Sequence, residues 1–278
     1  MNLFEKLQHI DRRIMYSLLV VVIAIPLIHR MDLPIIVSPA VQGAYDAVDR
    51  MPDNKIAIIS IIWSSGTLSE NGPQTQAIMR HMFMRNKKFA ILSWDPQGAT
   101  MAHEYAASIG KEYGKVYGRD WIDWGLKPVS NIVLLIQHMA RNVPEAIVSD
   151  YKGTPLSEFP VMKGVKTIKD VGLIADITPS GTLDVWIGFI YGPYRTPIIY
   201  APTAVMAPEG FNPLDAGQIK GMLTGMKGAA EYERLLGRSD FATRGAAALS
   251  TSHLLIIVLI ILGNLGYIAS LRRRADSS

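Results

Sequence analysis

Short polar side chains gather after several apolar runs of the sequence, where a turn leads into the next segment. Hydroxyl, carboxylate and amide groups in such turns can hold a small polar ligand, and a serine near a carboxylate can take part in hydrolysis. Backbone N–H groups of turns rich in glycine and serine can also hold an anion. The candidate ligand-binding residues are Ser65, Gly66, Glu70, Asp95, Gln97, Asp176, Ser180 and Thr203.

The same residue types have an ordinary structural use. Serine, threonine, aspartate and glycine are favoured in turns and at the first residue of helices, whatever the function of the protein. A ligand site therefore requires residues from several turns to meet at one place. Whether they meet depends on the elements between the turns.

Apolar runs alternate with helical patterns along the middle of the chain. The run KIAIISIIW at 55–63 is continuous and rich in isoleucine, which is typical of a strand buried on both faces. Other runs at 88–94, 171–177 and 197–205 indicate further strands. The alternation predicts an α/β fold with a mostly parallel sheet and helices on both faces, and the carboxyl ends of its strands lie at one edge.

Helical patterns lie between these runs and after the last of them, at 74–86, 101–113, 131–140, 183–191 and 216–236. The stretch 150–170 is rich in proline, glycine and lysine, so we expect a long loop there. The aromatic segment 111–125 is expected to pack on the domain, with contact to a partner or to lipid head groups as the alternative.

Composition and charge exclude several classes of function. The chain carries 28 basic and 24 acidic residues and no cysteine. The basic excess lies near the two ends, whereas a nucleic-acid-binding protein carries it on the folded domain, so we expect no nucleic-acid partner. The absence of cysteine excludes disulfides and a cysteine nucleophile. The histidines show no metal-ligand spacing, so we expect no metal and no cofactor.

Two apolar runs flank the α/β pattern, and both are predicted to span a membrane. The first is uncharged from Ile14 to Ile28, and its alternative interpretation is a cleaved signal peptide. The second is uncharged from Gly245 to Ser270 and ends at three arginines. Basic residues cluster on the outer side of both runs, which places both termini in the cytoplasm.

The predicted organisation follows from these runs: a cytoplasmic N-terminus at 1–13, a transmembrane helix at 14–30, an extracytoplasmic α/β domain at 31–244, a transmembrane helix at 245–271 and a basic cytoplasmic tail at 272–278. The chain is thus expected to be a two-pass protein of the cytoplasmic membrane.

Three stretches resemble segments of prokaryotic membrane proteins that have the same two-anchor plan and no established activity. They are KEYGKVYGRDWIDWG at 111–125, DYKGTPLSEFPVMKG at 150–164 and GMLTGMKGAAEYE at 221–233. This resemblance implies the fold and the topology and nothing catalytic.

The order of an anchor, a strand, a helix and a second strand is similar to that of membrane-anchored ClpP-type serine peptidases of the signal-peptide-peptidase kind. The turn SWDPQG at 93–98 stands where that family has an Asn-Ser-Pro-Gly-Gly-like turn. The sequence departs from the family because it has no Ser-Gly-Gly nucleophile turn and no lysine placed as a general base.

The sequence therefore predicts a binding or assembly subunit of a membrane complex with no evident reaction. Its expected partners are the lipid bilayer and either another membrane protein or further copies of the chain. The alternative is a membrane-bound hydrolase of ClpP-like type with a Ser/Asp site at the strand ends.

Overall fold

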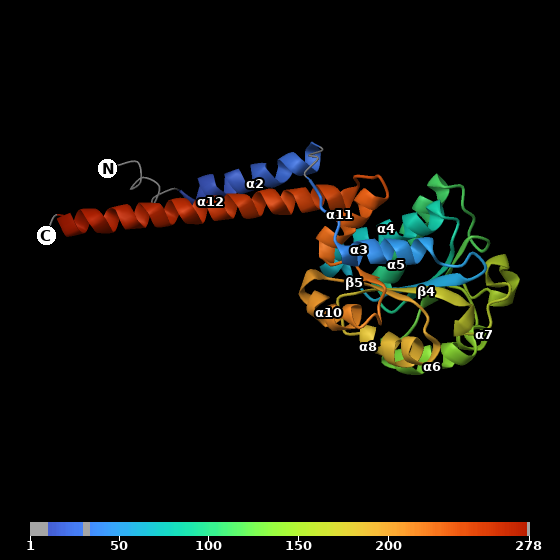
Figure 1. Cartoon of the computed structure of the whole chain (residues 1–278). Coiled ribbons are helices and arrows are strands. Elements are labelled where there is room, and N and C mark those ends of the chain that lie inside the picture. Colours follow the sequence, from blue (N-terminus) through green and yellow to red (C-terminus); the bar gives the residue numbers. More distant parts are fainter. Residues whose placement is uncertain (1–10, 30–33, 277–278) are drawn as a thin grey trace. The chain divides into compact units, whose positions relative to one another are not determined.

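A computed structural model of the chain describes residues 11–29 and 34–276 (Figure 1). The segment 1–10 of the expected cytoplasmic N-terminus, the junction 30–33 and the last residues 277–278 lie outside the described residues. The chain divides into two compact units: Ile35–Ala242 form an α/β unit, and the described residues of Met1–Pro34 and Thr243–Ser278 form a helical unit.

Six parallel strands form a single sheet in the order β3-β2-β1-β4-β5-β6. The strands are β1 (Ile56–Ile61), β2 (Lys88–Ser93), β3 (Trp121–Leu126), β4 (Val171–Thr178), β5 (Ile198–Pro202) and β6 (Gly221–Met222). Every residue of β1, β4 and β5 is buried, which explains the continuous apolar runs in the sequence. The predicted α/β fold with a parallel sheet is confirmed.

Helices cover both faces of this sheet (Figure 1). One face packs against α3 (Pro39–Asp49), α4 (Leu68–Met84), α5 (Pro96–Glu112) and α11 (Gly225–Leu235). The other packs against α6 (Ile132–Arg141), α7 (Val143–Ala146), α8 (Leu183–Trp186), a π-helical turn (Ile187–Tyr191), α9 (Gly192–Tyr194) and α10 (Ala207–Asp215). Side chains of β1 alternate between the two cores, with Ile59 in the first and Ile58 in the second.

Two of the differences between the structure and the expected elements concern strands of the sheet. The aromatic segment 111–125 contains the edge strand β3, and the loop after α7 covers the free side of that strand, where the Tyr151 N–H donates to the Asp123 carbonyl at 3.0 Å. The expected helix 216–236 is instead β6 followed by α11. Gly225 joins the two with a φ of +54°, a left-handed conformation that would interrupt a continuous helix.

Helix α11 holds both ends of the α/β unit. The Glu231 carboxylate accepts the backbone N–H and the hydroxyl of Ser38, which precedes α3, at 2.8 and 2.6 Å. The Glu233 carboxylate accepts the N–H groups of Asp240 and Ala242, both at 3.0 Å. Both glutamates are buried. The chain therefore enters and leaves the α/β unit beside the same helix.

The helical unit contains α2 (Arg12–Ile28) and all but the first two residues of α12 (Phe241–Asp276), and the two helices pack side by side (Figure 1). Pro26 has no N–H, so the Val22 carbonyl lacks its usual partner within α2. The Thr251 hydroxyl of α12 lies 3.2 Å from that carbonyl and supplies a donor, sharing its proton with two carbonyls of its own helix. In a membrane protein, this is how a proline inside a helix is accommodated by its neighbour.

One helix of the described residues is long and apolar enough to cross a membrane. The span is Phe241–Ile268 in α12, 28 residues long, and an 18-residue window of it has a mean hydropathy of 2.3 and is mostly not buried within the structure. At 1.5 Å per residue it measures about 42 Å, more than the roughly 30 Å of a hydrocarbon core. Helix α2 has 17 residues and measures about 26 Å.

We predict that Ile59→Asp prevents the α/β unit from folding. Ile59 is fully buried on a central strand, and an unpaired charge there costs several kcal/mol, comparable to the whole stability of a typical domain. Limited proteolysis of the full chain in detergent measures the effect. The control Lys88→Asp changes charge at an exposed position of the neighbouring strand and should leave the fragment pattern unchanged. A protease-resistant Ile59→Asp domain would contradict the packing.

Candidate functional site

The carboxyl ends of the strands lie at one edge of the sheet, where open α/β proteins bind ligands. The strand order reverses between the central neighbours β1 and β4. Helix α4 follows β1 on one face of the sheet, and α8 follows β4 on the other. The loops after these two strands therefore diverge, and the point between them is the topological switch point.

Gln97 joins the loops after β1 and β2. Its side-chain oxygen accepts the Ser65 N–H at 3.0 Å. Asp95 caps α5, where its carboxylate accepts the N–H groups of Gln97 and Gly98 at 2.8 and 3.0 Å, a bond type that contributes about 1 kcal/mol. Asp95 thus holds the start of the helix that carries Gln97. Ser65 and the adjacent Gly66 are exposed on a 3-10 turn.

Glu70, in the first turn of α4, joins the loops after β1, β5 and β6. Its carboxylate accepts the Ala204 N–H at 2.8 Å, and a Cβ on Gly225 would collide with the same oxygen. Thr203 precedes Ala204 and is 2% exposed. Among the described residues its buried hydroxyl has no hydrogen-bond partner. Here the structure brings together two sequence-predicted residues, Glu70 and Thr203.

Asp176 lies inside β4 rather than in the loop after it, and its side chain is fully buried. The Thr182 hydroxyl and the Trp186 indole donate to its carboxylate at 2.8 and 3.2 Å. Burial raises the pKa of Asp176 to about 6, against the hydrogen bonds from Thr182, Ser60 and Trp186, which favour the charged form. Ser60 lies opposite on β1 and accepts the Trp94 indole N–H at 3.2 Å.

Two further hydroxyls belong to the strand next to Asp176 and to the loop that follows β4. Tyr200 is opposite Asp176 on β5, and its buried hydroxyl has no partner in the part of the chain that the structure describes. Burial, with a contribution from the Asp176 charge, raises the pKa of Tyr200. Ser180, in the loop above, shares a 2.9 Å hydrogen bond with Thr178. An unpartnered buried phenol is a group that a ligand or an ordered water would satisfy.

The candidate residues therefore form three local groups along one edge. Ser65, Gly66, Asp95 and Gln97 make the first, Glu70 and Thr203 the second, and Asp176 and Ser180 belong to β4 and the loop that follows it. Asp95 and Asp176 have separate partners: Asp95 caps a helix, and Asp176 is bonded within the core. The arrangement offers polar groups at the edge and a protonatable carboxyl beneath it.

His81 of α4 belongs to a buried cluster that sequence reasoning missed. Its Nε2 lies 2.9 Å from the Asp49 carboxylate and its Nδ1 lies 2.7 Å from the Tyr232 hydroxyl, while its ring stacks on Tyr45. Burial lowers the pKa of His81 to about 4, although the Asp49 carboxylate opposes this. The imidazole is therefore neutral at pH 7, donating to Asp49 and accepting from Tyr232, and it links α3, α4 and α11.

A second histidine–carboxylate pair lies at the sheet edge formed by β3. The His103 Nδ1 is 2.9 Å from the carboxylate of buried Asp123, and the His103 side chain is 25% exposed. Burial raises the pKa of Asp123. No spacing in the sequence signals the pair, because it joins a helix to a strand that was not predicted. Among the described residues no serine hydroxyl is hydrogen-bonded to His103, so the pair has no serine placed as a nucleophile.

A cavity of about 370 Å³ lies at the opposite, amino end of the strands. It is bounded by α3 and by the residues that begin β4 or precede β5 and β6, namely Gly172, Pro197 and Lys220. Asp46 and Arg50 of α3 line it and form an ion pair of 2.9 Å. None of the sequence-predicted site residues lines this cavity.

Comparison of the chain with protein-family models, with curated proteins and with solved structures gives no match.

We predict opposite pH dependences of stability from Asp176 and His81. Because the pKa of Asp176 is raised, the folded chain keeps this proton at pH values where the unfolded chain loses it. The free energy of unfolding therefore falls by about 3 kcal/mol as the pH rises from about 4 to 6. The lowered pKa of His81 lowers the same free energy as the pH falls from 6.5 to about 4, by a similar amount. The two effects largely cancel in the unmodified chain.

Asp176→Asn should therefore expose the histidine effect, giving a protein that loses stability steeply below pH 6.5. Urea unfolding of the full chain in detergent, followed by tryptophan fluorescence, measures this, since all five tryptophans lie in the α/β unit. His81→Gln is the matched control and should lose stability as the pH rises instead. Parallel pH profiles for the two variants would contradict the assigned pKa directions.

Proposed function

We propose that the chain is a two-pass protein of the cytoplasmic membrane whose α/β domain acts as a binding or assembly subunit on the extracytoplasmic side. The observation that carries this proposal is the convergence of both ends of the α/β unit on α11. Glu231 holds the entering chain at Ser38 and Glu233 holds the leaving chain at Ala242. A domain held in this way can have both of its flanking helices in one membrane.

The helical unit supports the anchoring role. Helix α12 is long and apolar enough to cross a membrane, and it exposes large side chains along its length, among them Leu254, Ile257 and Ile261. Helix α2 exposes a similar set, including Ile14 and Val20. Exposed apolar surface of this extent is unfavourable in water and favourable in lipid. The bond from Thr251 to the Val22 carbonyl supports α2 as the second membrane helix, because it satisfies a backbone group that lipid cannot.

Charge supports the orientation. Lys6, Arg12 and Arg13 precede the first apolar run, and Arg272–Arg274 follow the second. Basic residues beside a membrane helix favour the cytoplasmic side. The α/β domain is then extracytoplasmic, and its polar carboxyl edge is the proposed surface for a ligand or a protein partner, the latter being another membrane protein or a second copy of the chain.

The geometry lends less support to the hydrolase alternative. A serine hydrolase needs a hydroxyl bonded to a general base. In the described part of the chain, Ser60 and Ser180 are bonded to other core and loop groups, and His81 and His103 are bonded to carboxylates. The Asp176 carboxyl, with its raised pKa, is the group nearest to an acid–base function, and it is buried among fixed partners.

Reporter fusions test the proposed topology. We expect a reporter that is active only outside the cytoplasm to be active when it is inserted in the exposed loop at Gly153, and inactive when it is fused before Met1 or after Ser278. A silent Gly153 fusion with an active fusion after Ser278 would reverse the orientation. An active fusion before Met1 together with an inactive fusion after Ser278 would show that α2 does not cross the membrane. Alkaline carbonate extraction supplies the control, because an inserted chain stays in the pellet.

A further inference from the structure

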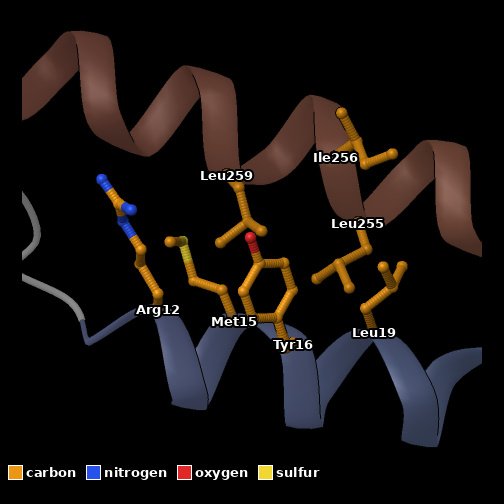
Figure 2. Close-up of a pocket in the computed structure, with 7 residues that line it drawn as sticks. All are labelled: Arg12, Met15, Tyr16, Leu19, Leu255, Ile256 and Leu259. Atoms are coloured by element: carbon orange, nitrogen blue, oxygen red, sulfur yellow. The ribbon is translucent and has the colours of Figure 1, made fainter.

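A pocket of about 230 Å³ lies between α2 and α12 within the helical unit (Figure 2). Residues of α2 that point toward α12 form one wall, and Leu255 and Leu259 of α12 point back toward them. The full lining is Arg12, Met15, Tyr16, Leu19, Leu255, Ile256 and Leu259. The pocket lies closer to the start of α2 than the hydrogen bond between Thr251 and the Val22 carbonyl.

The lining has two chemically distinct parts. Met15, Leu19, Leu255 and Leu259 present only apolar atoms, and the volume exceeds the roughly 150 Å³ of an apolar cavity that holds benzene. Arg12 lines one end of the pocket, and its guanidinium extends toward α12 (Figure 2). An occupant that satisfies both parts has an alkyl chain and an anionic oxygen group at the end of that chain. A guanidinium binds phosphate oxygens in particular through two parallel N–H donors.

The position of the pocket favours a lipid over a soluble ligand. Two of the lining residues, Tyr16 and Ile256, are 66% and 44% exposed, so the pocket opens onto the apolar outer surface of the helix pair. Under the proposed membrane topology, on which this inference rests, that surface contacts acyl chains. Arg12 stands at the first residue of α2, on the cytoplasmic side of the apolar run, at the end where a lipid phosphate group would lie.

We propose that this pocket is a binding site for an anionic phospholipid. The phosphate group lies against Arg12, and part of one acyl chain fills the space between Leu19 of α2 and Leu255 and Leu259 of α12. The lipid then supplies apolar contacts that the two helices do not make with each other along this part of the pair. Its negative charge matches the basic start of α2, where Arg13 adds to the local potential without lining the pocket.

Native mass spectrometry of the full chain tests this proposal. The chain is reconstituted in nanodiscs of phosphatidylcholine with one fifth phosphatidylglycerol, then released in mild detergent. We expect one phosphatidylglycerol to remain bound to each chain. Arg12→Gln should reduce this occupancy at least tenfold, and so should Leu255→Trp, which fills the pocket. Circular dichroism shows whether each variant keeps its helices.

Two matched controls give the test its specificity. Arg13→Gln removes the same charge one residue away, and Leu254→Trp adds the same bulk on an exposed position of α12. Both should keep the lipid. Equal loss in Arg12→Gln and Arg13→Gln would overturn the site in favour of a diffuse basic surface. Displacement of the lipid by millimolar inorganic phosphate alone would overturn it in favour of a phosphate site.

Vesicle flotation separates failure of the site from failure of the proposed function. A chain that floats with vesicles of pure phosphatidylcholine but retains no phosphatidylglycerol has the membrane helices and lacks the lipid site. A chain that floats neither with these vesicles nor with vesicles that contain one fifth phosphatidylglycerol contradicts the membrane topology, and the lipid site with it.

Discussion

The burial of a parallel sheet on both of its faces is the constraint on which the rest of the structure depends. Parallel neighbours cannot be joined by tight turns, so each connection crosses a face as a helix or a longer segment. Both faces then become apolar cores, which is why β1 and β4 have no exposed residue. The same constraint places the carboxyl ends of all six strands along one edge. The polar groups that follow neighbouring strands therefore lie on the same edge, although they are far apart in the sequence.

The strands that the sequence predicted are those in which this constraint is strongest. β1, β2 and β5 have apolar stretches of four residues and β4 has one of three before Asp176, whereas the edge strand β3 (WIDWGL) has no apolar stretch longer than two residues. Asp123 is tolerated there because His103 of α5, twenty residues earlier in the chain, forms a hydrogen bond with its carboxylate. β6 has only two residues, too few for any periodicity. The sequence pattern predicts a helix only from residue 74, because proline is unusual inside a helix. In the structure α4 begins at Leu68 and contains Pro73.

The candidate site was predictable in its location and less so in its internal contacts. The rule for parallel sheets identifies the edge, but it does not say which polar side chains serve the fold. Asp95 is a helix cap, as its residue type favours, and Asp176 is part of the core because Ser60, Thr182 and Trp186 surround it. Of these three, Ser60 comes from a distant part of the chain. The neighbour of Asp176 on β1 is therefore determined by which strands pair and in which register. The sequence around Asp176 alone does not predict that register.

The attachment of both chain ends to α11 has a mechanical consequence. A pull transmitted through the flanking segments reaches the α/β unit at Ser38 and Ala242, and Glu231 and Glu233 carry it at two points on one short helix. Such a force acts on two nearby residues of α11. It does not act on the ends of β1 and β4, so the hydrogen bonds between these two strands are not stretched directly. Force applied to the chain on either side of the α/β unit would therefore strain these carboxylate contacts before it strains the sheet.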